Sequence, residues 1–428
     1  MDLVHTNSSL ITKRTSCRLC NSNRLRMILP MKPSPIADAY IIPTQKSEKQ
    51  PLFPLDLYQC ESCGHAQNLD IVNPDTLFTD YIYTTSSSMG LVKHFENYAE
   101  NILKDFNIST GSLAVEIGSN DGTLLKYVKQ AGMRVIGVDP AKEIASKATA
   151  NGILTYPNFF SSKLAQSILA ENGPAKLLLA NNVYAHSDSL RDITKGIELL
   201  LDDDGVFVFE VSYLLDIIDY YLFDTIYHEH LSYHSITPLI PFFKSFGLEL
   251  FDVQKIQTKG GSMRCFVQKI TGKRPCTINV NKMIQLEKER GLHKPSIFQT
   301  YACKIQERKN ELNAFLKEAI KNKKSIVGYG ASTTVTTLMY QFELESQLDF
   351  LVDDNIAKQG RLSPGAHLEV KPSSALYDLN PDIVIILAWQ YSKPILNRHS
   401  KFLEGKGSFV IPLPNLEVVS SQTAGAYL

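Results

Sequence analysis

Apolar runs alternate with helix-like stretches through the middle of the chain. Four runs are typical of parallel strands buried on both faces: Ser112–Ile117, Arg134–Val138, Leu177–Ala180 and Val206–Val211. Between them, stretches such as Thr123–Ala131 and Ala141–Asn151 are expected to be helices. Because strands and helices alternate, the pattern predicts βαβ units in a doubly wound α/β sheet.

Further elements are expected on both sides of this alternation. Leu91–Phe106 is predicted to be a helix, because its apolar residues fall on one stripe. Leu248–Lys255 and Ser262–Ile270 are predicted to close the sheet as two antiparallel strands. The alternation then stops around Thr271–Val280, which indicates a boundary.

A second α/β series follows this boundary. It comprises a long polar helix at Ser296–Asn322, strands at Ser325–Tyr329, Leu348–Val352 and Ile383–Ala388, and a helix at Thr333–Phe342. The start of the chain, in contrast, is rich in proline and cysteine, which is typical of a small loop-rich module. We therefore expect three domains, at residues 1–78, 79–270 and 271–428.

Charge and hydropathy argue against two classes of partner. The 428 residues carry 44 basic and 44 acidic side chains, a balance that does not favour a nucleic-acid-binding face. No apolar run reaches the roughly 18 residues of a membrane span, and the N-terminus lacks a secretory signal pattern. We expect a cytoplasmic protein without nucleic-acid or membrane partners, as a monomer or small homo-oligomer.

Four of the seven cysteines form two Cys-x-x-Cys pairs, Cys17 with Cys20 and Cys60 with Cys63. In a reducing compartment such pairs indicate metal ligands before disulfides. Two pairs complete a tetrahedral zinc site of four sulfurs, which leaves no open position for catalysis. We therefore predict a structural zinc ion, with four free thiols as the alternative. His65, Cys265, Cys276 and Cys303 are interpreted as ordinary residues.

The segment Val115–Gly122 joins a predicted strand to a predicted helix through glycines, which let a ligand approach the backbone. Asp139 ends the next strand, where a carboxylate can accept ribose hydroxyls. The spacing Gly118-x-x-x-Gly122 differs from the dinucleotide pattern Gly-x-Gly-x-x-Gly, but spacing alone does not separate adenosine cofactors. A tight turn without a ligand is the alternative. The candidate cofactor-binding residues here are Glu116, Gly118, Asn120, Asp121, Gly122 and Asp139.

Two polar segments follow neighbouring strands and gather groups suited to proton transfer. One is Tyr227-His228-Glu229-His230, after Val206–Val211, and the other is Asn181–His186, after Leu177–Ala180. Histidine is the side chain best suited to proton transfer near neutral pH. The alternative is that these residues only cap and brace loops. Metal binding by His228 and His230 is disfavoured, since no third ligand is evident.

The glycine-containing turn Gly328–Thr334 leads from a predicted strand into a predicted helix. Amides at a helix N-terminus favour phosphate groups. Lone glycine turns are weak signals, so an anion site and a plain turn both stay open.

These motifs, in this order, resemble the three-domain sugar C-methyltransferases, and the resemblance covers nearly the whole chain. Glu116 resembles the acidic start of the class I methyltransferase signature. The motifs that carry the resemblance are the two cysteine pairs, Tyr81-Ile-Tyr83-x-x-Ser86, Asn181-Asn182 with His186, Tyr227-His228-Glu229-His230, Lys259-Gly-Gly-Ser-x-Arg264, Gly328-Tyr-Gly-Ala331, Asp353-Asp354 with Lys358-Gln-Gly-Arg361, Pro364-Gly365, and Ala388-Trp389-x-Tyr391.

The resemblance implies a class I methyltransferase domain of Rossmann-like fold between a zinc-binding module and a C-terminal Rossmann-like domain. It implies S-adenosylmethionine as cofactor, with Asn181 and Asn182 beside it. The implied substrate is a 4-keto-deoxysugar linked to dTDP or another nucleoside diphosphate, held partly by the C-terminal domain and methylated at C3 or less often C5.

For the chemistry we expect an enolate mechanism. His230 is the predicted general base, with Glu229 orienting it, and Tyr227 and His186 are expected to stabilise the enolate oxygen. Tyr81 is expected to line the sugar pocket.

Two positions depart from the family pattern. Thr334 stands where the family usually has lysine, and Lys259 stands where it usually has histidine. The first weakens the expectation of phosphate contacts at that turn, and the second allows a different sugar or activity. Three other functions stay open: an O-methyltransferase, a nicotinamide-dependent sugar-nucleotide oxidoreductase or epimerase, and a zinc-containing adaptor without activity.

Overall fold

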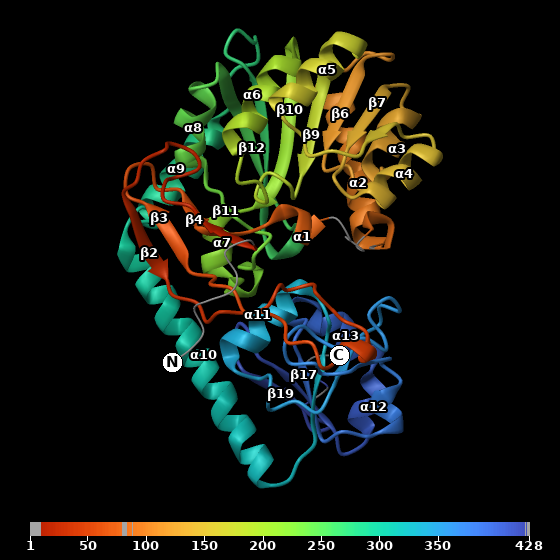
Figure 1. Cartoon of the computed structure of the whole chain (residues 1–428). Coiled ribbons are helices and arrows are strands. Elements are labelled where there is room, and N and C mark those ends of the chain that lie inside the picture. The colour runs from red at the N-terminus through yellow and green to blue at the C-terminus, as the bar shows by residue number, and fades with distance from the viewer. Residues whose placement is uncertain (1–9, 79–83, 88, 424, 426–428) are drawn as a thin grey trace. The chain divides into compact units, whose positions relative to one another are not determined.

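The computed structural model describes residues 10–78, 84–87, 89–423 and 425, in two compact units (Figure 1). The first unit consists of Met1–Arg26, Tyr58–Leu215 and Leu231–His293, and the second of Met27–Leu57, Asp216–His230 and Lys294–Leu428. Two segments thus leave the first unit and fold with the C-terminal part of the chain. We name Met27–Leu57 the strap and Asp216–His230 the excursion.

A seven-stranded sheet forms the centre of the first unit. Its strand order is β12-β13-β10-β9-β6-β7-β8, where the strands are β6 (Leu113–Ile117), β7 (Arg134–Val138), β8 (Thr155–Tyr156), β9 (Ala175–Asn181), β10 (Leu201–Ser212), β12 (Leu248–Ile256) and β13 (Ser262–Lys269). The strands β8, β7, β6, β9 and β10 run parallel, and β13 pairs antiparallel with both β10 and β12. The predicted doubly wound sheet with two antiparallel closing strands is confirmed.

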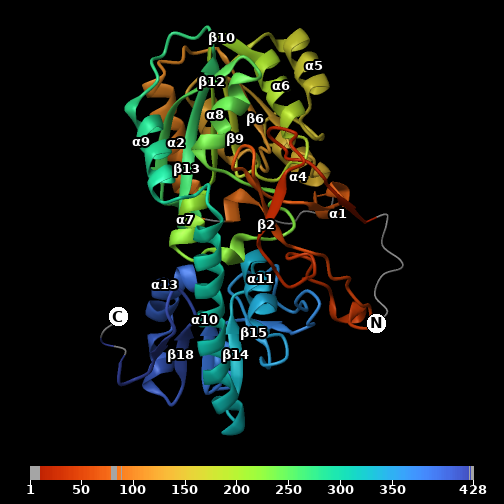
Figure 2. The ribbon, with the colours of Figure 1, turned by 90° about the vertical axis from the view of Figure 1, so that its left-hand side faces the viewer.

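Helices cover both faces of this sheet (Figures 1 and 2). They are α2 (Met89–Asp105), α3 (Thr123–Gln130), α4 (Lys142–Ala150), α5 (Ser162–Asn172), α6 (Leu190–Leu200), α8 (Ile236–Lys244) and α9 (Ile278–Glu289). Because alternate residues of a strand face opposite sides, Val206 and Val208 of β10 join the core under α2 and α3. Phe209, which follows Val208 and faces the opposite side, packs against Phe243 of α8.

The cysteine-rich module is built into the first unit by strand pairing. β1 (Ile11–Lys13) pairs with β5 (Asp70–Val72), and a second sheet has the order β11-β4-β3-β2, with β2 (Leu25–Leu29), β3 (Leu57–Cys60), β4 (Ala66–Asn68) and β11 (Ser232–Tyr233). β11 lies far along the chain, directly after the excursion. The short helix α1 (Pro74–Phe78) and the 3-10 turn η2 (Thr85–Ser87) follow the module.

The second unit contains a six-stranded sheet in the order β16-β15-β14-β17-β18-β19. Its strands are β14 (Ile326–Tyr329), β15 (Leu351–Val352), β16 (Val370–Lys371), β17 (Ile383–Ile386), β18 (Ser408–Ile411) and β19 (Glu417–Val419). All pairs are parallel except β18 with β19. Its helices are α10 (Pro295–Lys321), α11 (Thr333–Phe342), α12 (Ala375–Asp378) and α13 (Ser392–Arg398). This confirms the predicted second α/β series.

The strap belongs to the second unit through contacts along its length. Thr336 of α11 donates a hydrogen bond to the Ala37 carbonyl at 2.8 Å, and Ile41 forms a β-bridge with Leu362. Between the end of β2 and the start of β3 the strap has no helix or strand long enough to leave a periodic pattern in the sequence. No described helix combines the length and hydropathy that a membrane crossing requires.

Candidate active site and zinc site

The two cysteine pairs meet in the first unit. The sulfur atoms of Cys17 and Cys63 lie 3.6 Å apart, those of Cys20 and Cys60 lie 3.5 Å apart, and all four lie within 4.8 Å of one another. A tetrahedral zinc ion with bonds of about 2.3 Å separates its sulfur ligands by about 3.8 Å. The four thiols therefore fit one zinc ion, as the sequence predicted.

Each pair forms a tight knuckle that aims both sulfurs inward. The Asn21 amide donates to the Cys17 carbonyl at 3.0 Å, and the Gly64 amide donates to the Cys60 carbonyl at 2.8 Å. Asn21 and Gly64 have φ of 59° and 84°, a region that glycine and asparagine tolerate best. A hydrogen bond from Cys63 is the main cause that lowers the pKa of Cys17 to about 5, which suits a thiolate ligand.

Arg18 lies between the two cysteines of the first pair, and its side chain is fully buried. It donates to the Asp188 carboxylate at 3.0 Å and to the carbonyls of Asn68 and Leu231. Burial lowers the pKa of Arg18 to about 10, so the guanidinium stays charged at neutral pH. One cation thus joins the knuckle to Asp188, in the loop after β9, and to the residue that follows the excursion.

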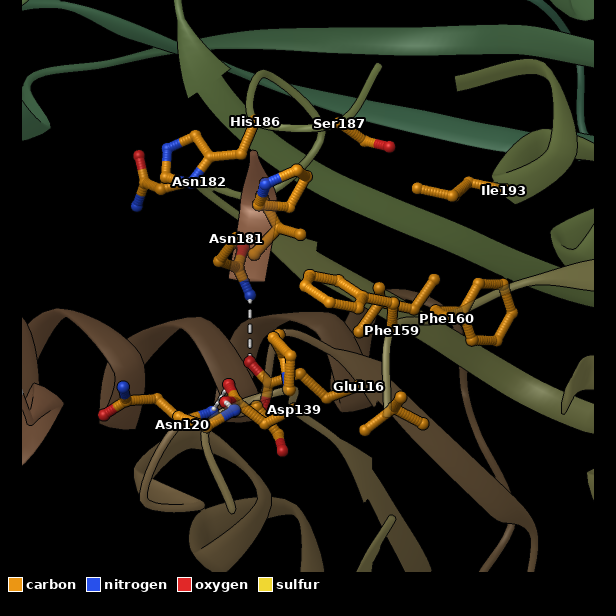
Figure 3. A pocket seen from close by; sticks show the side chains of 18 of the residues that line it. Glu116, Asn120, Asp139, Phe159, Phe160, Asn181, Asn182, His186, Ser187 and Ile193 are labelled. Atoms are coloured by element: carbon orange, nitrogen blue, oxygen red, sulfur yellow. Dashed lines mark hydrogen bonds between the residues drawn. The ribbon is translucent and has the colours of Figure 1, made fainter. Parts of the chain in front are cut away.

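A cavity of about 540 Å³ opens at the carboxyl ends of the parallel strands in the first unit. That volume suits a small organic ligand. Its lining residues lie at or beyond the ends of four strands: Glu116 in β6 with Gly118 and Asn120 after it, Asp139 after β7, Phe159 and Phe160 after β8, and Asn181 at the end of β9 with Asn182 and His186 after it (Figure 3). This is the edge at which doubly wound sheets bind nucleotides and related cofactors.

Glu116 and Asn181 place polar atoms without partners at the cavity. The Asn181 amide donates to Oε1 of Glu116 at 3.5 Å (Figure 3). Within the described part of the chain, the other oxygen of Glu116 and the amide oxygen of Asn181 are buried without a hydrogen-bond partner. Burial raises the pKa of Glu116. Because buried acceptors without donors are costly, the pair is suited to a ligand that carries N–H groups.

Asp139 anchors the turn after β6 while keeping capacity for a ligand. Its carboxylate accepts the Asn120 amide at 2.8 Å and the Ala141 amide at 2.9 Å. Each carboxylate oxygen has a second lone pair, so Asp139 can also accept hydroxyl groups such as those of a ribose. Burial raises its pKa.

The side chains of Asn120 and Asp121 accept hydrogen bonds from backbone amides of the protein. The Thr85 amide donates to Asn120 at 2.9 Å, and the Ser86 amide donates to Asp121 at 2.9 Å. They therefore hold the η2 turn beside the cavity. Asn120 lines the cavity, whereas Asp121 and Gly122 are not among its lining residues.

Gly118 is the glycine on which the turn depends. Its φ is 68°, and a Cβ atom there would lie 2.2 Å from a methyl of Val183. No other residue fits without moving Val183, which also lines the cavity.

No pattern in the sequence marks several of the lining residues, including Phe159, Phe160 and Ile193. The two phenylalanines follow β8, which has two residues and is too short for a periodic signal. Lys259, which departs from the family pattern, also lines the cavity. Tyr81 and Tyr83 lie outside the described residues.

The residues Tyr227–His230 end the excursion and belong to the second unit. Nδ1 of His230 lies 2.7 Å from the Thr225 carbonyl, and its Nε2 lies 2.9 Å from the Tyr227 hydroxyl. Because a carbonyl only accepts, Nδ1 carries the hydrogen of the neutral ring. The basic lone pair of His230 is therefore on Nε2, beside Tyr227.

His228 has a different environment from His230. Its Nε2 lies 3.3 Å from the Phe53 carbonyl of the strap, and the two rings meet edge to face. Burial lowers the pKa of His228 to about 4, so its ring is neutral. These contacts make His228 a bracing residue. Glu229 is buried as well.

Leu231, the first residue after the excursion, is bound within the first unit to the loop that follows β9. The Leu231 amide donates to the Ala185 carbonyl at 2.9 Å.

Three successive segments of the chain match known protein families. Residues 17–78 match a family described as "Putative zinc binding domain", residues 93–253 match a methyltransferase domain, and residues 257–414 match the C-methyltransferase C-terminal domain. The chain is 29% identical to C-methyltransferase NovU from Streptomyces niveus over 408 residues, which are 95% of this chain and 97% of that protein. These matches identify the chain as a C-methyltransferase.

Solved structures similar to this C-methyltransferase match only part of it. One is magnesium protoporphyrin IX methyltransferase from Synechocystis PCC 6803 with bound SAM, at 14% identity and a TM-score of 0.33, covering 42% of this chain and 80% of that chain. Another is the PH0226 protein from Pyrococcus horikoshii OT3, at 13% identity and a TM-score of 0.36, covering 44% and 94%. S-adenosylmethionine is the methyl donor of this C-methyltransferase, and the four-cysteine cluster is its zinc site.

Replacing Gly118 by alanine is expected to impair cofactor binding in this C-methyltransferase. A side chain at positive φ costs about 1–3 kcal/mol, so the affinity for S-adenosylmethionine should fall about tenfold or more. Calorimetric titration measures this loss. Gly90→Ala is the matched control, since no atom lies within 4 Å of its added Cβ, and it should bind normally. Equal affinity of both variants would contradict the role of Gly118.

Replacing Arg18 by leucine is expected to lower the free energy of unfolding of the first unit by about 3–5 kcal/mol. The change removes a buried cation and its hydrogen bonds to the Asp188 carboxylate and to the carbonyls of Asn68 and Leu231. Asp188 keeps only its partly exposed partner Arg14. Arg24→Leu is the control in the same module, because Arg24 is exposed and its ion pair should contribute less than about 1 kcal/mol. Denaturant titration compares the two variants, and similar losses would show that Arg18 is not a central contact.

Proposed function

We propose that this enzyme methylates C3 of a 4-keto-deoxysugar carried by a nucleoside diphosphate. The observation that carries the proposal is the hydrogen bonding of His230. The Thr225 carbonyl holds its Nδ1 hydrogen and leaves Nε2 as the basic atom. Methylation of carbon needs such a base, because a C–H group is no nucleophile until its proton has been removed.

The ketone at C4 makes this proton removal accessible. It acidifies the neighbouring C–H, since the resulting charge delocalises onto the ketone oxygen as an enolate. In the proposal, the Tyr227 hydroxyl turns from His230 to that oxygen, and Nε2 takes the proton. His186 donates a second hydrogen bond to the enolate oxygen, the electrostatic contribution that usually matters most. We assign Glu229 to orienting His230 and Tyr81 to the sugar pocket.

S-adenosylmethionine supplies an electrophilic methyl group when bound in the cavity of the first unit. We propose that Glu116 and Asn181 accept hydrogen bonds from its ammonium group, because their buried oxygens lack donors. Asp139 binds the ribose hydroxyls, and the backbone at Gly118 and Asn120 allows close approach. Asn182 contributes from the neighbouring turn, where its φ is 56°.

The carboxyl edge of the sheet in the second unit is the proposed site of the nucleotide. There the Ala331 amide donates to the Asp353 carboxylate at 2.6 Å, just as the Asn120 amide donates to Asp139 in the first unit. The same strand-end design thus occurs twice. Since Thr334 has no charge, diphosphate binding would depend on the amides at the start of α11.

The four thiols of the zinc site require a reducing compartment. On this ground we propose a cytoplasmic location.

The substrate can be identified by incubation with methyl-labelled S-adenosylmethionine and a panel of nucleotide-linked 4-keto-deoxysugars. The expected product gains one methyl group bound to carbon, which NMR distinguishes from a methyl group on oxygen. An O-methyl product would replace the enolate mechanism with deprotonation of a hydroxyl. No product from any 4-keto sugar would overturn the proposed substrate class.

Replacing His230 by asparagine is expected to reduce turnover by about 10²–10⁴-fold, the usual contribution of a general base. The affinity for S-adenosylmethionine should stay nearly unchanged, because His230 does not line the cofactor cavity. Steady-state kinetics and calorimetry measure the two effects. Near-native turnover of His230→Asn would show that another group is the base.

Replacing Asp139 by asparagine should have the opposite profile. The variant loses the charged acceptor for ribose hydroxyls, so calorimetry should show weaker cofactor binding. At saturating cofactor, turnover should recover towards the wild-type value. Unchanged affinity would contradict the role of Asp139.

A further inference from the structure

Trp389, the single tryptophan of the chain, donates a hydrogen bond to a residue of the excursion. Its Nε1 lies 2.8 Å from the Asp224 carboxylate, and both side chains are buried. Trp389 begins the turn η5 (Trp389–Tyr391) after β17, and Asp224 lies in the turn η3 (Phe223–Thr225). The indole N–H of Trp389 is thus one contact between the C-terminal domain and the excursion.

Asp224 is adjacent to the residue that fixes His230. Thr225 belongs to the same η3 turn, and its carbonyl accepts Nδ1 of His230 at 2.7 Å. The Thr225 amide and hydroxyl both donate to the Leu222 carbonyl. These two bonds hold Thr225 in the η3 turn, so the direction of the Thr225 carbonyl is set by η3. Where η3 lies therefore decides where the His230 ring lies.

The second anchor of η3 is α11. Phe223 stacks on Phe342 with ring centroids 5.2 Å apart, and the Thr337 hydroxyl donates to the Ile226 carbonyl at 3.3 Å. Apolar packing alone would hold the turn against α11. The hydrogen bond from Trp389 to Asp224 also fixes the orientation of the η3 turn, because hydrogen bonds depend more strongly on angle than aromatic stacking does.

Burying the Asp224 carboxylate beside Trp389 is unfavourable for folding, which points to a role other than stability. A buried carboxylate pays a desolvation cost that a leucine at the same place would not. Burial raises the pKa of Asp224 to about 7, and the indole N–H counteracts this rise by binding the carboxylate.

We propose that Trp389 and Asp224 are positioning residues for the base: the C-terminal domain orients His230 through Asp224 and the Thr225 carbonyl. The proposal rests on the proposed function, in which His230 removes the substrate proton. The domain thus takes part in proton abstraction without touching the reacting carbon.

The test uses proton abstraction as its readout. With S-adenosylhomocysteine in the cofactor site, methyl transfer is impossible, but the base can still exchange the substrate C–H with D₂O. NMR follows this exchange. Trp389→Phe keeps an aromatic ring and deletes the N–H donor, and Asp224→Asn keeps the shape of the acceptor. Tyr220→Phe is the control, because it removes an exposed hydroxyl from the same excursion.

We expect Trp389→Phe to slow exchange and kcat together by about tenfold to a hundredfold, the range expected when a reacting group is displaced by about 1 Å. The KM for the sugar and the affinity for S-adenosylmethionine should change less than about twofold. In the His230→Asn background, Trp389→Phe should have no further effect on exchange, because residues that act through one another are not additive. Tyr220→Phe should match the wild type.

Two outcomes overturn the proposal in distinguishable ways. If His230→Asn abolishes exchange while Trp389→Phe exchanges at the wild-type rate, the base assignment holds and the positioning role is wrong. If His230→Asn retains exchange, the proposed function itself fails. In Asp224→Asn, an unchanged Trp389 emission maximum shows that the indole is still buried, so slower exchange then reports orientation and not unfolding.

Discussion

The guanidinium of Arg18 has no exposed surface, so its charge must be balanced by groups within the protein. Its partners come from three distant parts of the chain: Asp188 after β9, the Asn68 carbonyl in β4 and the Leu231 carbonyl after the excursion. Arg18 can reach all three because Cys17 and Cys20 fix its backbone on either side. The zinc ion thus acts on the fold beyond its own ligands, by placing a cation that joins the module to the methyltransferase domain.

The order of the chain explains why this contact matters. The excursion leaves the first unit after β10 and returns at Leu231. Leu231 is held by Arg18 and by the Ala185 carbonyl, so the return point is fixed on the side of the first unit. On the side of the second unit, Asp224 and Ile226 bond to Trp389 and Thr337. The proposed base lies between two anchored ends, while the cofactor cavity lies wholly in the first unit.

The parallel sheet was predictable from the sequence, because strands buried on both faces are apolar at every position. β7 was predicted with its exact bounds, and so was α11. The strap was not, since irregular segments have no period and its partners lie some 300 residues away. For the same reason, Phe159 and Phe160 could not be assigned to the cavity. Glycine spacing indicated the turn at Gly118, but it could not show that Asp121 binds the protein at Ser86.

The two histidines of the excursion show most clearly where sequence reasoning ends. His228 and His230 lie two residues apart in one polar segment, and their spacing gives them equal standing as a base. Their backbone partners separate them: His228 directs Nε2 to the Phe53 carbonyl of the strap, whereas His230 directs Nδ1 to the Thr225 carbonyl and keeps Nε2 beside a hydroxyl. The carbonyl at Nε2 of His228 leaves its lone pair on Nδ1, which is buried among the described residues, and burial lowers the pKa of His228 to about 4, so this ring is a weak base. The carbonyl at Nδ1 of His230 places its lone pair on Nε2, beside the Tyr227 hydroxyl. The choice of base therefore depends on the tautomer that a backbone oxygen sets in each ring and on how deeply the ring is buried, neither of which the spacing of the histidines reveals.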